Sequence, residues 1–143
     1  MRNRSSVTVV IAAALAMLSS LPASADVRVR VDKSSQTMTV AVDGWVQHRW
    51  PVSTAKRGYY TPTGSWRPFR LEPNWYSRKY DNAPMPNSIF FTGGYAIHGT
   101  VHVSQLGRPP SRACIPLHPA PARDLFALVR QYGMKNTRIS ITN

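Results

Sequence analysis

Cysteine is almost absent from this 143-residue chain, which contains only Cys114. An intrachain disulfide is therefore excluded. Acidic residues are also scarce, because six Asp and Glu stand against 18 Lys and Arg and give a formal net charge of +12. Glu72 and Asp81 are the only acids between Gly44 and Asp124, so the paired carboxylates of glycosidase chemistry are poorly supported.

Long apolar runs are limited to one segment near the N-terminus. Arg2 and Arg4 precede an apolar run over residues 7–18, and the segment closes on the small residues Ala23-Ser24-Ala25. This pattern is typical of a secretory signal peptide, and the run is shorter than the roughly 20 residues of a membrane-spanning helix. We therefore expect residues 1–25 to be a signal peptide that directs the protein to the periplasm, with no stable membrane span after cleavage. A retained anchor is the alternative.

The remaining residues, 26–143, are enough for one domain. The chain is 43% hydrophobic and 17% charged, which allows a buried core. All but two of the basic residues lie in this domain, but no nucleic-acid-binding signature accompanies them, so we expect no nucleic-acid partner. The charge indicates either a solvated surface or attraction to the anionic cell envelope, including peptidoglycan carboxylates.

Alternation of apolar and polar residues with period two predicts a mainly β domain. Short paired strands are also expected around Gly93-Gly94, at residues 88–91 and 95–98, so that His98 ends a strand. The Asp43-Gly44 pair predicts a hairpin turn. The clearest strands are predicted at Val27–Asp32, Thr37–Val42, Trp45–Trp50 and Thr137–Thr142.

A single helix is expected in the C-terminal half of the chain. We expect Pro121 in its first turn, Asp124 near the positive end of its dipole and Gly133 at its end. The three- and four-residue spacing that predicts it is carried by Leu125, Leu128, Val129 and Tyr132.

Prolines and glycines interrupt residues 51–86, where six prolines and two glycines occur. Loops and short edge strands should dominate there. The same stretch carries six Tyr and Trp residues, which we expect to pack against the sheet or to line a groove: Tyr59, Tyr60, Trp66, Trp75, Tyr76 and Tyr80.

Cys114 and His98 form a candidate catalytic pair. A thiol nucleophile needs a base within hydrogen-bond reach and backbone N–H groups that hold the oxyanion formed on carbonyl attack. The two residues stand sixteen positions apart, with a Gly- and Pro-containing turn at residues 107–110 between them. Spacing alone leaves open an inert core cysteine. His102 is expected on a loop or the surface, and no metal site is expected.

The run IHGT at residues 97–100, followed by SRACIPLHP at residues 111–119, resembles the histidine and cysteine motifs of L,D-transpeptidase catalytic domains, the YkuD family. The stretches VDGW, PVSTAKRGYYTPTGSWRP and YSRKYDNAPMPNSIFFTGGYAIHG look similar to the family too, so the resemblance covers essentially all of residues 26–143. It implies a mainly β, YkuD-like sandwich or barrel of mixed strands, with one helix in the C-terminal half and long Pro/Gly-rich loops.

By this resemblance, Cys114 is the nucleophile, His98 is the catalytic histidine, and the carbonyl group of Gly99 orients the imidazole. Ser111 matches the motif serine, and the backbone N–H groups of Ala113 and Cys114 would form the oxyanion hole. Three further side chains are expected to contact substrate: Arg112, Tyr80 and Met85.

The implied reaction acts on a peptidoglycan stem peptide. The Cys114 thiolate attacks the amide between the third, L-centred diamino acid and the terminal D-Ala, a thioester forms, and D-Ala leaves. An amine on a second stem or on an acceptor envelope protein then resolves the thioester, whereas water would give hydrolysis. No cofactor is required, and a monomer is expected.

Two residues depart from the family's pattern. Ala113 stands where glycine is usual, and an alanine held at positive φ costs about 1 kcal/mol. Pro116 stands where arginine is usual, which removes a charged side chain and a backbone donor together. Two alternatives to the transpeptidase therefore stay open: a catalytically impaired peptidoglycan-binding protein on the same scaffold, and a thiol hydrolase of peptidoglycan crosslinks.

Overall fold

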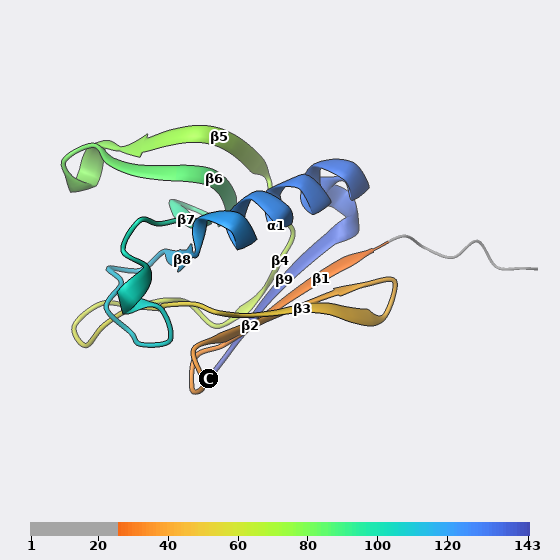
Figure 1. Cartoon of the computed structure of the whole chain (residues 1–143), viewed down its shortest axis with the longest axis horizontal. Coiled ribbons are helices and arrows are strands. Elements are labelled where there is room, and N and C mark those ends of the chain that lie inside the picture. Colours follow the sequence, from red (N-terminus) through yellow and green to blue (C-terminus); the bar gives the residue numbers. More distant parts are fainter. Residues whose placement is uncertain (1–25) are drawn as a thin grey trace, which may run out of the picture.

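The computed structural model describes residues 26–143 (Figure 1). The predicted signal peptide lies outside the described residues. The one α-helix among them, α1, spans Pro119–Tyr132, and three 3₁₀ turns are η1 (Arg78–Tyr80), η2 (Val103–Gln105) and η3 (Met134–Asn136). The strands are β1 (Val27–Asp32), β2 (Thr37–Val42), β3 (Trp45–Pro51), β4 (Gly64–Trp66), β5 (Arg70–Ser77), β6 (Ala83–Thr92), β7 (Tyr95–Gly99), β8 (Ile115–Leu117) and β9 (Thr137–Thr142).

The strands form two mixed sheets. One has the order β3-β2-β1-β9-β4, in which β1 and β9 are parallel and the other pairs antiparallel. The other has the order β5-β6-β7-β8, in which β7 and β8 are parallel. The predicted mainly β fold of mixed strands with one helix is confirmed.

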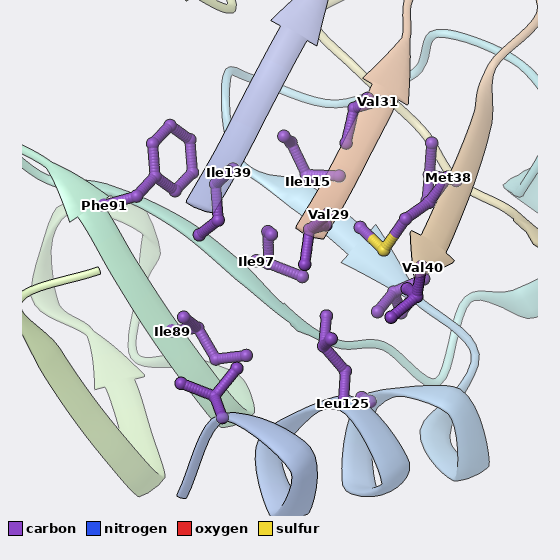
Figure 2. Packing of buried hydrophobic residues seen from close by; sticks show 14 of the residues in the cluster. Val29, Val31, Met38, Val40, Ile89, Phe91, Ile97, Ile115, Leu125 and Ile139 are labelled. Atoms are coloured by element: carbon purple, nitrogen blue, oxygen red, sulfur yellow. The ribbon is translucent and has the colours of Figure 1, made fainter. Parts of the chain in front are cut away.

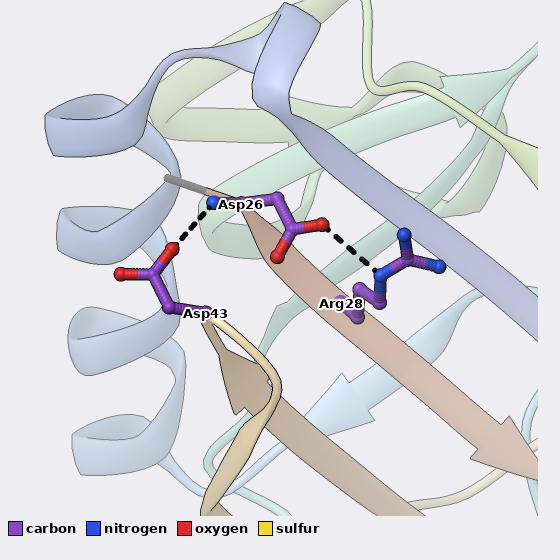
Figure 3. A network of polar contacts seen from close by, with 3 residues as sticks. All are labelled: Asp26, Arg28 and Asp43. Carbon is purple, nitrogen blue, oxygen red and sulfur yellow. Dashed lines mark hydrogen bonds and ion pairs between the residues drawn. The ribbon is translucent and has the colours of Figure 1, made fainter. Parts of the chain in front are cut away.

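The turn of the β2–β3 hairpin also anchors the start of β1. Asp43 and Gly44 have φ of 50° and 84°, as a two-residue turn that matches the twist of its strands requires. Asp26 lies beside this turn (Figure 3): its backbone nitrogen donates to Asp43 Oδ1 at 2.9 Å, and its Oδ2 lies 3.1 Å from Arg28 Nε. The predicted hairpin is confirmed, and its tip fixes the point where the chain enters β1.

The expectation of loops and short strands at residues 51–86 is wrong in its second half. β5 has eight residues and β6 has ten, and both contain proline. β5 is an edge strand, and Pro84 and Pro86 lie in the part of β6 that pairs only with β5. Because β7 does not pair with this part of β6, Pro84 and Pro86 remove no hydrogen bond between β6 and β7.

Helix α1 begins at Pro119, so Pro121 lies in its first turn as expected. Asp124 lies beyond that turn, and its expected interaction with the positive end of the dipole is wrong. Gly133 ends the helix with φ 93° and donates its N–H to the Val129 carbonyl oxygen at 2.8 Å. No helix within residues 26–143 combines the length and the hydropathy needed to cross a membrane.

The main core lies between α1 and the two sheets (Figure 2). Helix α1 packs on β6 and β7 and touches β1, and its Leu125 points toward Val29, Val40 and Ile97. Since side chains alternate along a strand, burying Ile97 turns the neighbouring side chains of β7 to the opposite face of the four-stranded sheet. The core therefore sets which residues of β7 and β8 face outward.

Candidate active site

Strands β7 and β8 place Cys114 and His98 on the same face of the four-stranded sheet. The register pairs His98 with Pro116, so Cys114, which immediately precedes β8, lies beside Ala96. All four residues face away from the main core. Cys114 and His98 are thus diagonal neighbours on adjacent strands, with Cα atoms roughly 8 Å apart by strand geometry.

The His98 ring is oriented by a backbone carbonyl group. Nδ1 lies 2.8 Å from the oxygen of Gly99, and because that oxygen can only accept, Nδ1 carries the proton and Nε2 is the basic nitrogen. Burial lowers the pKa of His98, and the Gly99 hydrogen bond offsets part of this effect. The ring is therefore neutral at pH 7. A Cβ on Gly99 would lie 3.2 Å from Pro86 Cγ, so this strand end has little room to move.

The Cys114 thiol is half-buried against a small apolar cluster that includes Met85. It donates to the carbonyl oxygen of Gly94 at 3.8 Å. Burial raises the pKa of the thiol, while a backbone hydrogen bond from Ala96 and the positive charge of Lys79 oppose that rise with smaller effects. The resting thiol is therefore protonated at neutral pH, and a base must remove its proton before it can attack.

Hydrogen bonds fix the segment that precedes Cys114. Ser111 pairs with Ala55 in an isolated parallel bridge. Ser111 Oγ donates to the Cys114 carbonyl oxygen at 2.5 Å and accepts from the Ala113 N–H at 3.2 Å. The Ala113 N–H already has a partner, whereas none of the hydrogen bonds found among residues 26–143 uses the Cys114 N–H. Of the two expected oxyanion donors, the Cys114 N–H is the free one.

Ala113 has φ 150°, inside the region that disfavours residues with a Cβ. We expect Ala113→Gly to raise the free energy of unfolding by about 1 kcal/mol, because glycine adopts this conformation without steric cost. Denaturant unfolding at neutral pH measures the change. Ala55→Gly is the matched control, because Ala55 does not have positive φ, and it should destabilise instead. A less stable Ala113→Gly variant would contradict the interpretation that the backbone of Ala113 is strained.

Cys114 opens onto a cleft of about 1190 Å³. Among residues 26–143, no carboxylate lines this cleft, and the basic residues that line it are Arg70, Arg78, Lys79 and Arg112. Its aromatic wall is formed by Tyr59, Tyr60, Trp75, Tyr76, Tyr80, Phe90 and Tyr95. Five of the six predicted Tyr and Trp residues thus line a groove, and Trp66 packs instead against Phe91 with ring centroids 5.4 Å apart.

The three side chains expected to contact substrate all line this cleft, namely Arg112, Tyr80 and Met85. The Arg112 guanidinium lies 5.1 Å from the centroid of the Tyr80 ring, and Lys79 Nζ lies 5.4 Å from it. Two cations therefore hold one aromatic ring in the wall. His98 and Pro116 are not wall residues of the cleft. Sequence reasoning missed Lys79, because the β5–β6 hairpin that carries it was expected to be a loop.

The other histidines lie away from the cleft. His102 is exposed, as expected, and His118 precedes α1 without a side-chain capping bond. His48 stacks on Trp50 with ring centroids 4.4 Å apart. Throughout the described part of the chain, no three His, Cys, Asp or Glu side chains are grouped so that they could hold a metal ion.

Comparison with known protein families gives a match over nearly all of the described domain. The sequence model of the L,D-transpeptidase catalytic domain, YkuD, matches residues 26–141. The chain therefore belongs to the YkuD family of L,D-transpeptidase catalytic domains. A comparison with curated protein sequences finds no significant match.

Solved structures of L,D-transpeptidases share this fold. One from Mycobacterium smegmatis is 24% identical with a TM-score of 0.75, covering 83% of this chain and 59% of that one. One from Stackebrandtia nassauensis is 26% identical with a TM-score of 0.72, covering 82% and 56%. L,D-transpeptidase 3 from Mycobacterium tuberculosis, in complex with a faropenem-derived adduct, is 19% identical with a TM-score of 0.67, covering 83% and 61%. The match thus spans less than two thirds of each of these chains.

Proposed function

We propose that this protein is an exported L,D-transpeptidase that acts on peptidoglycan stem peptides, with Cys114 as nucleophile and His98 as general base. Membership of the YkuD family supports a peptidoglycan-crosslinking transpeptidase at the level of the family. The observation that carries the proposal for this chain is the placement of Cys114 in a cleft, on the same sheet face as a neutral histidine oriented by Gly99.

In the proposed reaction, His98 accepts and then donates a proton in each of two steps, formation and resolution of the thioester. His98 Nε2 takes the thiol proton, and Cys114 Sγ attacks the carbonyl carbon of the amide between the L-centred diamino acid and D-Ala. The imidazolium then protonates the departing amine of D-Ala, the C–N bond breaks, and a thioester remains. An acceptor amine attacks the thioester, its proton passes through His98 to the leaving thiolate, and the free enzyme returns.

The resting thiol must turn before this reaction can begin. In the described structure the thiol points to the Gly94 carbonyl oxygen rather than to the His98 ring. Rotation about the Cα–Cβ bond of Cys114 moves Sγ along the sheet face toward His98, and catalytic hydrogen bonds are commonly loose in a free enzyme. We propose that bound substrate selects the rotated thiol.

The cleft suits a substrate that carries carboxylates. Its basic side chains, with no acid among the wall residues, attract the carboxylates of stem peptides. We propose that Arg112, held over the Tyr80 ring, binds a substrate carboxylate and compensates for the arginine that Pro116 replaces. The acceptor is a second stem peptide or an envelope protein, and the place of action is the periplasm.

Intact-protein mass spectrometry with a carbapenem tests the proposal. A transpeptidase with a reactive Cys114 forms a stoichiometric adduct, and peptide mapping places it on Cys114. Absence of an adduct on folded protein would favour the alternative of a non-catalytic peptidoglycan-binding protein. The strained backbone of Ala113 and the proline at position 116, where arginine is usual, are the observations that favour this alternative.

Product analysis with a purified stem peptide separates transfer from hydrolysis. A transpeptidase yields crosslinked product only when an acceptor stem is present. Release of the free acid at the same rate with and without acceptor would identify the thiol hydrolase instead.

A further inference from the structure

Thr61 connects the segment after β3 to residues 111–114, here called the cysteine loop. It does so from a buried position outside the cleft. Its side chain is buried, and it is not a wall residue of the cleft. Oγ1 accepts from the Ala55 N–H at 2.9 Å and lies 2.8 Å from the Ala113 carbonyl oxygen. Because the Ala55 N–H can only donate, the hydroxyl proton of Thr61 is the one given to the Ala113 oxygen.

This bond fixes the direction of a second group in the same peptide. The described chain contains no cis peptide bond, so the peptide between Ala113 and Cys114 is trans, and its C=O and N–H point in opposite directions. Thr61 holds the carbonyl side, whereas Ala113 and Cys114 line the cleft. The Cys114 N–H therefore points away from Thr61, and it belongs to a residue that lines the cleft.

We propose that Thr61 is a positioning residue that aims the Cys114 N–H at the oxyanion of the tetrahedral intermediate. The inference rests on the proposed function, because it assigns a donor for the same acyl transfer. Thr61 does not touch substrate; it holds the peptide in the orientation that the transition state needs, so that no reorientation is required during the reaction.

Two observations make this one donor important. Ser111 Oγ already accepts from the Ala113 N–H, which leaves the Cys114 N–H as the unengaged donor of the expected pair. Ala113 is also held at φ 150°, a strained conformation that persists only while surrounding contacts enforce it, and the bond from Thr61 is one of these contacts.

Thr61 is itself attached to a rigid support. The chain leading to it is held at Thr54, whose backbone N–H donates to Gln36 Oε1 at 2.8 Å. Gln36 Nε2 returns a bond to Thr54 Oγ1 at 2.6 Å, and both side chains are buried. Hydrogen bonds thus connect the β1–β2 turn to Thr54, and Ala55, the next residue along the chain, to Thr61 and the cysteine loop.

Two reactions of the same thiol separate a positioning role from a structural one. Carbapenem acylation passes through an oxyanion, whereas alkylation by iodoacetamide displaces iodide without forming one. For Thr61→Val, which keeps the shape but loses the hydroxyl, we expect acylation to slow by about 10- to 100-fold. Alkylation should stay within about twofold of wild type, since attack on a saturated carbon needs no oxyanion hole. Thr61→Ser, the matched control, keeps the hydroxyl and should restore acylation.

An equal fall in both rates for Thr61→Val would overturn the assignment, because it would mean that the thiol itself had been displaced. Unchanged acylation would overturn it as well. Thr61→Ala is the second variant if Thr61→Val does not fold; it leaves room for a water to satisfy the Ala55 N–H, and the same difference between the two rates is expected. Wild-type protein that is alkylated but never acylated would refute the proposed function before any Thr61 variant is compared.

Discussion

Replacing Cys114 by alanine is expected to abolish the carbapenem adduct and to lower stem-peptide crosslinking by at least about 10⁴-fold, because the covalent intermediate can no longer form. The fold should survive, with a cost of about 1 kcal/mol or less, since the thiol is only half-buried and its hydrogen bond to Gly94 is a long contact of 3.8 Å. Mass spectrometry measures the adduct, and thermal unfolding measures the stability.

Ser111→Ala is the informative control for the Cys114→Ala variant. Ser111 is the other hydroxyl or thiol nucleophile in the motif, but its Oγ is engaged with the Cys114 carbonyl oxygen and the Ala113 N–H. We expect Ser111→Ala to slow acylation by loosening the loop while the adduct still forms on Cys114. Acylation that persists in Cys114→Ala and disappears in Ser111→Ala would mean that Ser111, and not Cys114, is the nucleophile.

The Cys114→Ala variant also isolates a pH effect on stability. Burial raises the pKa of the folded thiol, so the folded protein holds this proton at a pH where the unfolded chain has lost it. The resulting stabilisation is complete below the unfolded thiol's pKa, near 8.5, and is lost as the pH rises through the folded pKa. The difference in unfolding free energy between wild type and Cys114→Ala should therefore shrink from about pH 7 to about pH 10.

Four strands of the five-stranded sheet, β1, β2, β3 and β9, could be predicted from local pattern, whereas β5 and the first half of β6 could not. The alternation in Val27–Asp32 and Thr137–Thr142 reflects burial of one face, which the sequence displays directly. In β6, proline at positions 84 and 86 argues against a strand unless the strand's partners are known. Only the sheet order and register show that this part of β6 pairs with β5 alone.

The residues that carry the proposed chemistry were more predictable than the residues that hold them in position. His98, Gly99 and Cys114 could be singled out because their residue types and spacing match a motif with known mechanics. The contact of Thr61 with the Ala113 carbonyl oxygen joins residues 52 positions apart through a backbone atom, and no side-chain pattern encodes such a contact. Lys79 could not be predicted either, because its charge approaches Cys114 only after the β5–β6 hairpin has formed.

Replacing His98 by glutamine is expected to slow carbapenem acylation by about 10²- to 10⁴-fold at pH 7, because the amide cannot take the thiol proton. Burial raises the pKa of Cys114, which makes the loss of a nearby base more severe than it would be for an exposed thiol. The rate constant of adduct formation, followed by mass spectrometry, measures the change. His102→Gln is the matched control, four positions further along and exposed, and it should stay within about twofold of wild type.

The pH profile distinguishes a base from a residue that only maintains the fold. Burial lowers the pKa of His98, so wild-type acylation should persist on acidification below about pH 6.5, where an ordinary histidine becomes protonated. In His98→Gln the thiol must ionise by itself, and the rate should rise about tenfold per pH unit until the raised pKa of Cys114 is reached. A His98→Gln profile that runs parallel to that of wild type would mean that the imidazole does not accept the proton, and the base would then have to be sought among the residues that line the cleft.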